Sequence, residues 1–168
     1  VSAARTAPKA RGVDSIKTLI VDGEDLNVLA EAMEGRAGQK AQPTAGAFTR
    51  DAKNVKNSAA VVLIGVTGEP KKPDQPLNCG GCGYPSCTEF MADDKRRGED
   101  FRGPLCVFQT LDLGIALGSA AKMASELNID NRMMYTLGAA ARKLGLLQAD
   151  VIIGIPLSVS SKNPFFDR

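Results

Sequence analysis

The four cysteines of this 168-residue chain are the residues whose type and spacing predict chemistry most clearly. Cys79, Cys82 and Cys87 fall within nine residues, and the fourth, Cys106, follows nineteen positions later. Four thiolates can hold an iron–sulfur cluster or a structural zinc ion. Three ligands in one loop plus a distant fourth resemble a ferredoxin, whereas structural zinc sites more often use two separated ligand pairs. The pattern C-x2-C-x4-C-x18-C therefore favours an iron–sulfur cluster, with zinc and disulfides as alternatives.

The loop that carries the first three cysteines has a composition suited to wrapping around a cluster. Three glycines among residues 80–83 can take positive φ angles, which lets the backbone curl and turn N–H groups toward cluster sulfurs. Ser86 and Glu89 form a capping-box pattern, so we expect a helix to begin at about Cys87, and Cys106 to open the next helix. Plant-type [2Fe–2S] ferredoxins use the opposite order of spacings, and a compact loop with one outlying ligand fits a cubane better. We therefore expect a [4Fe–4S] cluster.

Composition and charge exclude several classes of function. The chain has no histidine, which excludes imidazole ligands and catalysis by Ser–His or Cys–His pairs. The net charge of +2 falls near zero once four thiolates surround a cluster core, and aromatic residues make up 5% of the chain, so a dedicated nucleic-acid binder is disfavoured. No apolar run reaches the ~18 residues of a membrane span, and no signal-peptide pattern is visible. Reduced cysteines and an iron–sulfur centre favour the cytoplasm of an anaerobe.

Hydrophobic periodicity predicts three strands and five helices in a single domain covering residues 1–168. The expected strands are short β-branched or continuously apolar runs: Ile16–Val21, Ala59–Val66, and Val151–Ile155 ending before Pro156. The expected helices are one capped by Asp22 and stopped by Gly35, then Ala47–Asn57, Cys87–Arg97, Cys106–Leu127, and one capped by Asp130 and ending near Leu144. These elements predict an α+β protein, a three-layer α/β/α sandwich with a mixed sheet and a Cys-rich cluster loop.

Charged residues around the cysteine loop have a structural and a functional interpretation. Lys71 and Lys72 lie in a proline-rich connector, where we expect solvated side chains, with steering of an acidic partner as the alternative. Lys95, Arg96 and Arg97 fall in the last turn of a predicted helix, where cations complement the helix dipole. A docking patch for a negatively charged redox partner is the alternative for these three residues.

Two further segments predict contacts with other elements or subunits. The helix Cys106–Leu127 is apolar nearly all round, so we expect it to be buried. Gly114 and Gly118 permit close approach of another backbone, either in the core, at a dimer interface or against a bound planar ligand. The tail Ser158–Arg168 ends in an aromatic pair, and we expect it to pack onto something, another subunit being one candidate.

The segment Leu77–Cys106 resembles the small [4Fe–4S] domain of the corrinoid iron–sulfur protein and of the B subunit of Rnf-type complexes. More of the chain resembles a family of ferredoxin-domain-containing proteins, through the cysteine loop and through Ala4–Gly12, Leu111–Lys122 and Asp130–Arg168. This resemblance implies a bound cluster and no particular reaction. It also implies that residues 77–106 form a cluster-binding insertion within the single domain.

The layout of the chain is also similar, more faintly, to the flavin-dependent nitroreductase fold. The shared features are a basic Ala-Pro segment before the first strand, a small-residue helix over Asp112–Ala124, and a late Gly-x-Pro after a strand. Members of that fold are intertwined dimers that bind FMN between subunits, with cations on the phosphate. The resemblance therefore implies a homodimer. It also implies that the cations at a flavin phosphate site are candidates among Arg5, Lys9, Arg11, Lys162 and Arg168.

Three functional hypotheses follow. The first is a ferredoxin-like electron-transfer protein, in which Cys79, Cys82, Cys87 and Cys106 hold a [4Fe–4S] cluster that serves a redox partner protein. The second is an FMN-dependent oxidoreductase of nitroreductase type, fed by the cluster. The third is a zinc-stapled interaction domain. The sequence names no catalytic residue and leaves open whether the protein is an enzyme.

Overall fold

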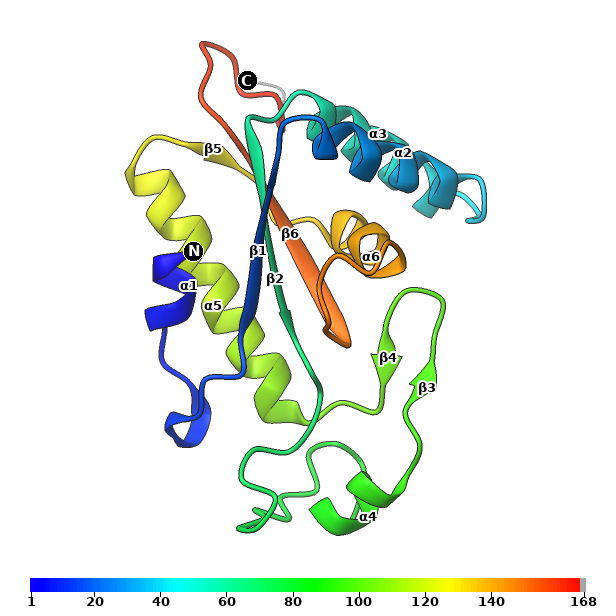
Figure 1. Ribbon diagram of the computed structural model, residues 1–168, viewed down its shortest axis with the longest axis vertical. Coiled ribbons are helices and arrows are strands. Elements are labelled where there is room, and N and C mark those ends of the chain that lie inside the picture. The colour runs from blue at the N-terminus through cyan, green and yellow to red at the C-terminus, as the bar shows by residue number, and fades with distance from the viewer. Residues whose placement is uncertain (167–168) are drawn as a thin grey trace.

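The computed structural model describes residues 1–166, so Arg168, one of the five cations considered for a flavin phosphate, lies outside the described residues. A four-stranded sheet runs through the middle of the molecule (Figure 1). Its strands, in spatial order, are β1 (Lys17–Asp22), β2 (Ala60–Val66), β6 (Val151–Ser158) and β5 (Asp130–Asn131). The α+β class is confirmed. Where we expected a mixed sheet, the pairings among the described strands are all antiparallel.

Helices cover both faces of this sheet and complete the three layers (Figure 1). One layer contains α1 (Ser2–Thr6) and α5 (Val107–Glu126), and the other contains α2 (Asp25–Ala37), α3 (Thr44–Lys56) and α6 (Tyr135–Lys143). Alternating strand residues divide into two cores. Val61 and Leu63 face α2, α3 and α6, whereas Val62, Ile64 and Val66 face α1 and α5. We call the sheet and these five helices the sheet body.

Glycines on both elements permit the close packing of α6 on β6: a Cβ atom built on Gly154 of β6 would lie 2.1 Å from a methyl carbon of Leu137 in α6. A Cβ atom built on Gly138 would lie 1.7 Å from the carbonyl oxygen of Ile152, so no larger residue fits there without moving the helix. The end of the same helix follows the sequence prediction. Gly145 has φ +72°, and the N–H of Leu146 donates to the carbonyl of Ala141, as in a Schellman motif.

The chain between β2 and α5, residues 67–106, lies at the lower end of the sheet, with its hairpin beside β6, and we call it the cluster end (Figure 1). It contains the short helix α4 (Cys87–Ala92) and a hairpin of β3 (Arg96–Arg97) with β4 (Arg102–Gly103). A one-turn 3-10 helix at Ala10–Gly12 connects α1 to β1 on the same side. No helix within residues 1–166 combines the length and the apolar character that crossing a bilayer would need.

Two helix starts were predicted wrongly. Asp22 is the last residue of β1, paired with Ala60, and the turn into α2 is made by Gly23 at φ +55°. Gly35 does not stop that helix, which continues to Ala37. Asp130 caps no helix either, because Asp130 pairs with Ser158 in β5. Because residues 130–131 pair with β6 instead of starting a helix, α6 begins only at Tyr135.

The last strand is longer than predicted and contains Pro156 in its interior, opposite Val61 of β2. Gly154 exchanges backbone hydrogen bonds of 2.8 and 3.1 Å with Met134 on the other side of β6. Positions two residues apart in a strand point their N–H groups the same way. The missing N–H of Pro156 therefore faces away from β2, and the pairing with β2 continues uninterrupted.

One prediction about burial is wrong and another is confirmed. Helix α5 is not buried all round: Leu111 and Ile115 are exposed, because α1 and the sheet cover the opposite side, which carries Leu113, Ala116 and Leu117. The tail packs onto another element as predicted, and that element belongs to this chain, since Phe165 is buried in the core that contains α2, α3 and α6.

Candidate metal centre

Local hydrogen bonds give the cysteine loop its curled shape. Gly80 and Gly83 have φ angles of +72° and +89°, and the N–H of Gly83 donates to the carbonyl of Gly80 over 2.9 Å. The side-chain oxygen of Asn78 accepts a 2.9 Å hydrogen bond from the N–H of Cys87, which closes the loop. Ser86 caps α4 as predicted, because its hydroxyl oxygen accepts from the N–H of Glu89 over 3.1 Å.

The fourth cysteine lies where the cluster end joins the sheet body. Cys106 is the N-cap residue of α5, and its N–H donates to the carbonyl of Gly68 over 2.7 Å. Its side chain accepts no capping hydrogen bond, so the thiol is not engaged by the helix end. The cysteine loop lies against this point: a Cβ built on Gly81 would come within 2.9 Å of a methyl carbon of Val107.

Three of the four cysteines share one small cavity. Cys79, Cys87 and Cys106 line it together with Arg11 and Lys71. The group therefore comes from the loop, from the first residue of α4 and from the start of α5, with Cys106 buried and Cys79 exposed. The cavity lining does not include Cys82, which is half-buried on the same turn of the loop. Within residues 1–166, no three Cys, Asp or Glu side chains lie close enough to hold a single metal ion.

Lys71 is not the solvated loop residue that we predicted. Its side chain is 2% exposed and forms an ion pair with Asp112 of α5, whose side chain is equally buried. The ammonium also donates to the carbonyl of Val13 over 2.6 Å, and the N–H of Ala10 donates to Asp112 over 3.0 Å. This pair therefore ties the connector and the N-terminal segment to α5 directly beside the cysteines.

The cations Lys95, Arg96 and Arg97 do not lie in a last helical turn. Helix α4 ends at Ala92, because Asp93 takes an extended conformation and accepts a hydrogen bond from the hydroxyl of Tyr84. Lys95 instead pairs with the buried Asp150 at the start of β6. Arg96 and Arg97 form β3, so the helix-dipole explanation does not apply to them.

Asp100, in the turn of this hairpin, anchors the hairpin to the sheet body. Its carboxylate accepts from Arg36 over 2.5 Å, from Lys40 over 2.7 Å and from the hydroxyl of Tyr135. Burial by itself would raise the pKa of Asp100, but these three donors outweigh it, and the net pKa is lowered. For Tyr135, burial and the hydrogen bond to Asp100 together raise the pKa to about 12.

The described cations that are candidates for binding a flavin phosphate do not lie together, and most of them already have a hydrogen-bond or ion-pair partner. Arg5 and Lys9 approach Asp14 at 3.0 and 3.9 Å. Arg11 donates to the carbonyl of Gln75 over 2.5 Å and so lies beside the cysteine loop. Lys162 is exposed in the segment after β6, beyond the opposite end of the sheet (Figure 1). Within one chain, then, Lys162 is not brought next to the other three.

Sequence reasoning missed the buried groups that fix the cluster end. Asp112 and Asp150 were the available signals, since each interrupts an otherwise apolar stretch that packs against the sheet. A carboxylate at such a position requires a partner, and the partners are Lys71 and Lys95. Neither partner could be identified from spacing, because both lie in irregular connectors far away in the sequence.

Solved structures similar to this one share its fold at low sequence identity. A nitroreductase with bound FMN from Desulfitobacterium hafniense matches 99% of this chain and 79% of its own, at 15% identity and a TM-score of 0.57. A nitroreductase with bound FMN from Bacteroides fragilis matches 96% and 75%, at 13% identity and a TM-score of 0.56. The fold is therefore that of the nitroreductases, as the fainter resemblance implied.

Sequence comparisons identify the family. An uncharacterized protein from Archaeoglobus fulgidus is 48% identical over 167 residues, which span 98% of this chain and 85% of that protein. A family model for a proposed Fe–S cluster motif matches residues 76–98, and the model described as an uncharacterized protein containing a ferredoxin domain (DUF2148) matches residues 102–168. These matches confirm the stronger of the two resemblances, and the chain belongs to this family of ferredoxin-domain proteins.

Proposed function

We propose that the protein is a ferredoxin-like electron-transfer protein in which Cys79, Cys82, Cys87 and Cys106 bind a [4Fe–4S] cluster. The observation that carries the proposal is the cavity shared by the thiols of Cys79, Cys87 and Cys106, which come from separate segments of the cluster end. A thiolate donor set suits iron–sulfur clusters, and such a cluster would supply one-electron transfer.

The sequence spacing of the cysteines favours a cluster over one zinc ion. Three of them fall in one glycine-rich loop and the fourth is distant, whereas structural zinc sites more often use two separated ligand pairs.

The protein contributes shape and electrostatics to this site. The amino-terminal end of the 20-residue helix α5, which carries Cys106, presents partially positive N–H groups toward the anionic thiolates. Lys71 lines the cavity, and its charge is already paired with that of Asp112 on α5. We propose that residues 77–106 act as the cluster-binding insertion of a single domain, in the cytoplasm of an anaerobe.

The direct test is anaerobic purification followed by iron and sulfide analysis and EPR of the reduced protein. About four irons and four sulfides per chain are expected. Cys106→Ala should leave a three-iron or labile cluster, while Ser119→Ala on the same helix should leave iron content unchanged. Unaltered spectra and iron content in Cys106→Ala would contradict ligation by Cys106, and a colourless protein containing zinc would support the zinc-stapled interaction domain instead.

A second candidate is an FMN-dependent oxidoreductase fed by the cluster, and the fold favours it. The similar structures from Desulfitobacterium hafniense and Bacteroides fragilis are described with bound FMN. On this function Arg5, Lys9, Arg11, Lys162 and Arg168 remain the candidate phosphate contacts, with Lys162 contributed by the partner subunit. Extraction of the cofactor and its fluorescence would distinguish the candidates, because an electron-transfer protein with the cluster alone releases no flavin.

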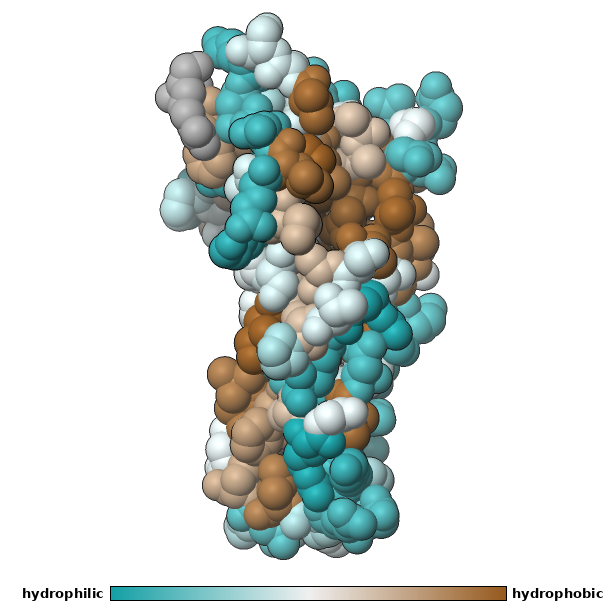
Figure 2. All heavy atoms as spheres, turned by 90° about the vertical axis from the view of Figure 1, so that its left-hand side faces the viewer, coloured by the Kyte–Doolittle hydropathy of each residue, from teal (hydrophilic) through white to brown (hydrophobic). Residues whose placement is uncertain are grey.

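A homodimer is proposed for either function, on the evidence of the uncovered side of α5. The apolar side chains of Leu111 and Ile115 are exposed on this side, and Figure 2 shows the side of the molecule on which α1 and α5 lie. A Cβ added at Gly114 or Gly118 would meet no atom within 4 Å, so no other part of residues 1–166 fills this side of the helix. Light scattering should give twice the chain mass, and Ile115→Glu should shift it to the monomer.

A further inference from the structure

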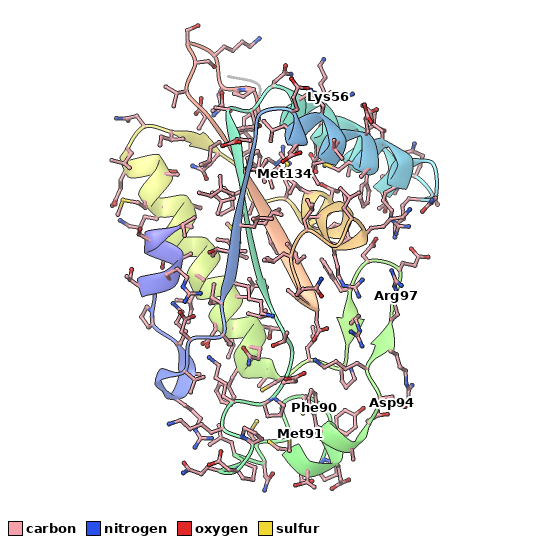
Figure 3. All side chains as sticks on the ribbon, viewed as in Figure 1. Lys56, Phe90, Met91, Asp94, Arg97 and Met134 are labelled. Carbon is pink, nitrogen blue, oxygen red and sulfur yellow. The ribbon has the colours of Figure 1, made fainter. Side chains whose placement is uncertain are left out.

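A second, strongly polar cavity lies between the sheet body and the hairpin of β3 and β4, apart from the cysteines. It has a volume of about 320 Å³, within the roughly 300 to 1,000 Å³ typical of small-molecule pockets. Its lining comes from the starts of β1 and β6, the residues after β2, the end of α6, and the hairpin on which Figure 3 labels Arg97. Five cationic side chains line it, against two carboxylates: Lys17, Lys95, Arg97, Arg102 and Arg142, with Glu69 and Asp150.

The two carboxylates do not neutralise this cavity. Asp150 is engaged by Lys95, and it also accepts from the N–H of Gly68 over 2.9 Å. Arg102 reaches Asp150 only at 3.9 Å, and Glu69 is exposed and approaches Lys95 at 3.4 Å. The lining therefore keeps three positive charges in excess.

Two of the arginines lack an acidic partner among residues 1–166. The Nε atom of Arg142 is buried with no hydrogen-bond partner, and its Nη1 atom donates only to the backbone carbonyl of Asp100, over 3.2 Å. Burial lowers the pKa of the Arg142 guanidinium, and the charges of Arg97 and Arg102 lower it further. Arg97 forms no ion pair within the described part of the chain. A half-buried guanidinium that faces like charges, with a buried Nε atom that has no partner, is unfavourable unless an anion joins the group.

We propose that this cavity is a binding site for a phosphate group, with Arg142 and Arg97 as its principal ligands. A phosphate oxygen would accept from the unpaired Nε of Arg142 and from Arg97, and its two negative charges would offset most of the excess. Lys17 and the hydroxyl of Thr67 offer further donors on the opposite wall. A small ligand suits the enclosed position of Arg142 better than the carboxylates of a docking protein, which would meet the exposed Arg96 and Arg97 first.

The test is isothermal titration calorimetry on the anaerobically isolated protein in phosphate-free buffer of low ionic strength, with inorganic phosphate and AMP as probes. Arg142→Gln should weaken binding about tenfold or more, and Arg97→Gln several-fold. The matched control is Lys143→Gln, which removes the same charge from an exposed position next to Arg142 on α6 and should change the affinity less than twofold. Tighter binding of AMP than of phosphate assigns the site to a phosphate ester, and equal binding assigns it to the free oxyanion.

The proposal is overturned if neither probe shows saturable binding, or if Lys143→Gln weakens binding as much as Arg142→Gln does, since that equality would indicate general charge attraction. Arg97→Gln keeps the test valid should Arg142→Gln disturb the hairpin, because the side chain of Arg97 is exposed and holds no structural hydrogen bond among the described residues. Iron content measured on each sample separates loss of the anion site from loss of the cluster.

Discussion

In the sheet body, β2 and β6 bury apolar side chains on both faces, whereas in the cluster end the buried positions are Gly68, Lys71, Phe90 and Cys106. The first region contains two hydrophobic cores. The second is held to the first by hydrogen bonds, by ion pairs and by the packing of Phe101 and Leu105 against one of these cores. If the proposed cluster is bound, we therefore expect it to contribute folding free energy mainly to the cluster end.

The same substitution in each region tests this contrast most strongly. Phe48→Ala removes a fully buried ring from the sheet body and should lower the free energy of unfolding by about 3–5 kcal/mol. Phe90→Ala, in the cluster end, should lower it by about 1 kcal/mol or less, because that region can open without the body unfolding. Denaturant titration followed by circular dichroism measures both. Equal losses would show that the two regions unfold as one unit.

Breaking the ion pair that joins the two regions should have the next largest effect. Lys71→Met leaves the carboxylate of Asp112 buried without its charge partner and should cost about 3 kcal/mol of stability. The matched control is Lys72→Met, at the exposed neighbouring position, which should change little. The double variant Lys71→Met, Asp112→Leu should recover most of the loss, and failure to recover would mean that the pair does more than satisfy its own charges.

Acid should loosen the hairpin before the sheet body. Because the folded-state pKa of Asp100 is lowered, its contribution to stability is complete above its unfolded pKa of about 4 and is lost as the pH falls through the folded value. We expect a loss of about 1–2 kcal/mol, seen as lower protection factors for hydrogen exchange in residues 96–103 below pH 4, relative to the intrinsic exchange rates at each pH. Asp100→Asn should remove this pH dependence, whereas Asp94→Asn, at an exposed position, should retain it.

The smallest expected effect concerns encounter with a partner. Arg96 is 84% exposed, so Arg96→Gln should slow reduction by an acidic electron donor two- to threefold at low salt and not at high salt. Lys53→Gln, on the exposed side of α3 in the sheet body, is the control. Stopped-flow reduction measures both variants, and equal rates would exclude Arg96 from the docking surface.

The sequence predicted best where a pattern is local. Continuous apolar runs located β2, and the serine cap at Ser86 located the start of α4. Prediction failed where a distant segment decides the outcome: Asp130 pairs with β6, and Lys71 is buried because α5 offers Asp112. Of the candidate site, the cysteines and the capping of their loop could be predicted. The cavity around Arg142 could not, because its lining is assembled from segments that no periodicity connects.

The position of Cys106 as the N-cap residue of α5 has a consequence for the order of folding and metal binding during synthesis. Cys106 comes close to Cys79 and Cys87 only after α5 has packed on the sheet and the N–H of Cys106 has donated its hydrogen bond to the carbonyl of Gly68. In a nascent chain that lacks the carboxy-terminal strands, Cys79, Cys82 and Cys87 would be available in their loop, but Cys106 would not yet be held beside them. If the chain binds the proposed cluster, iron would be incorporated only after the whole polypeptide has been synthesised and its carboxy-terminal half has folded.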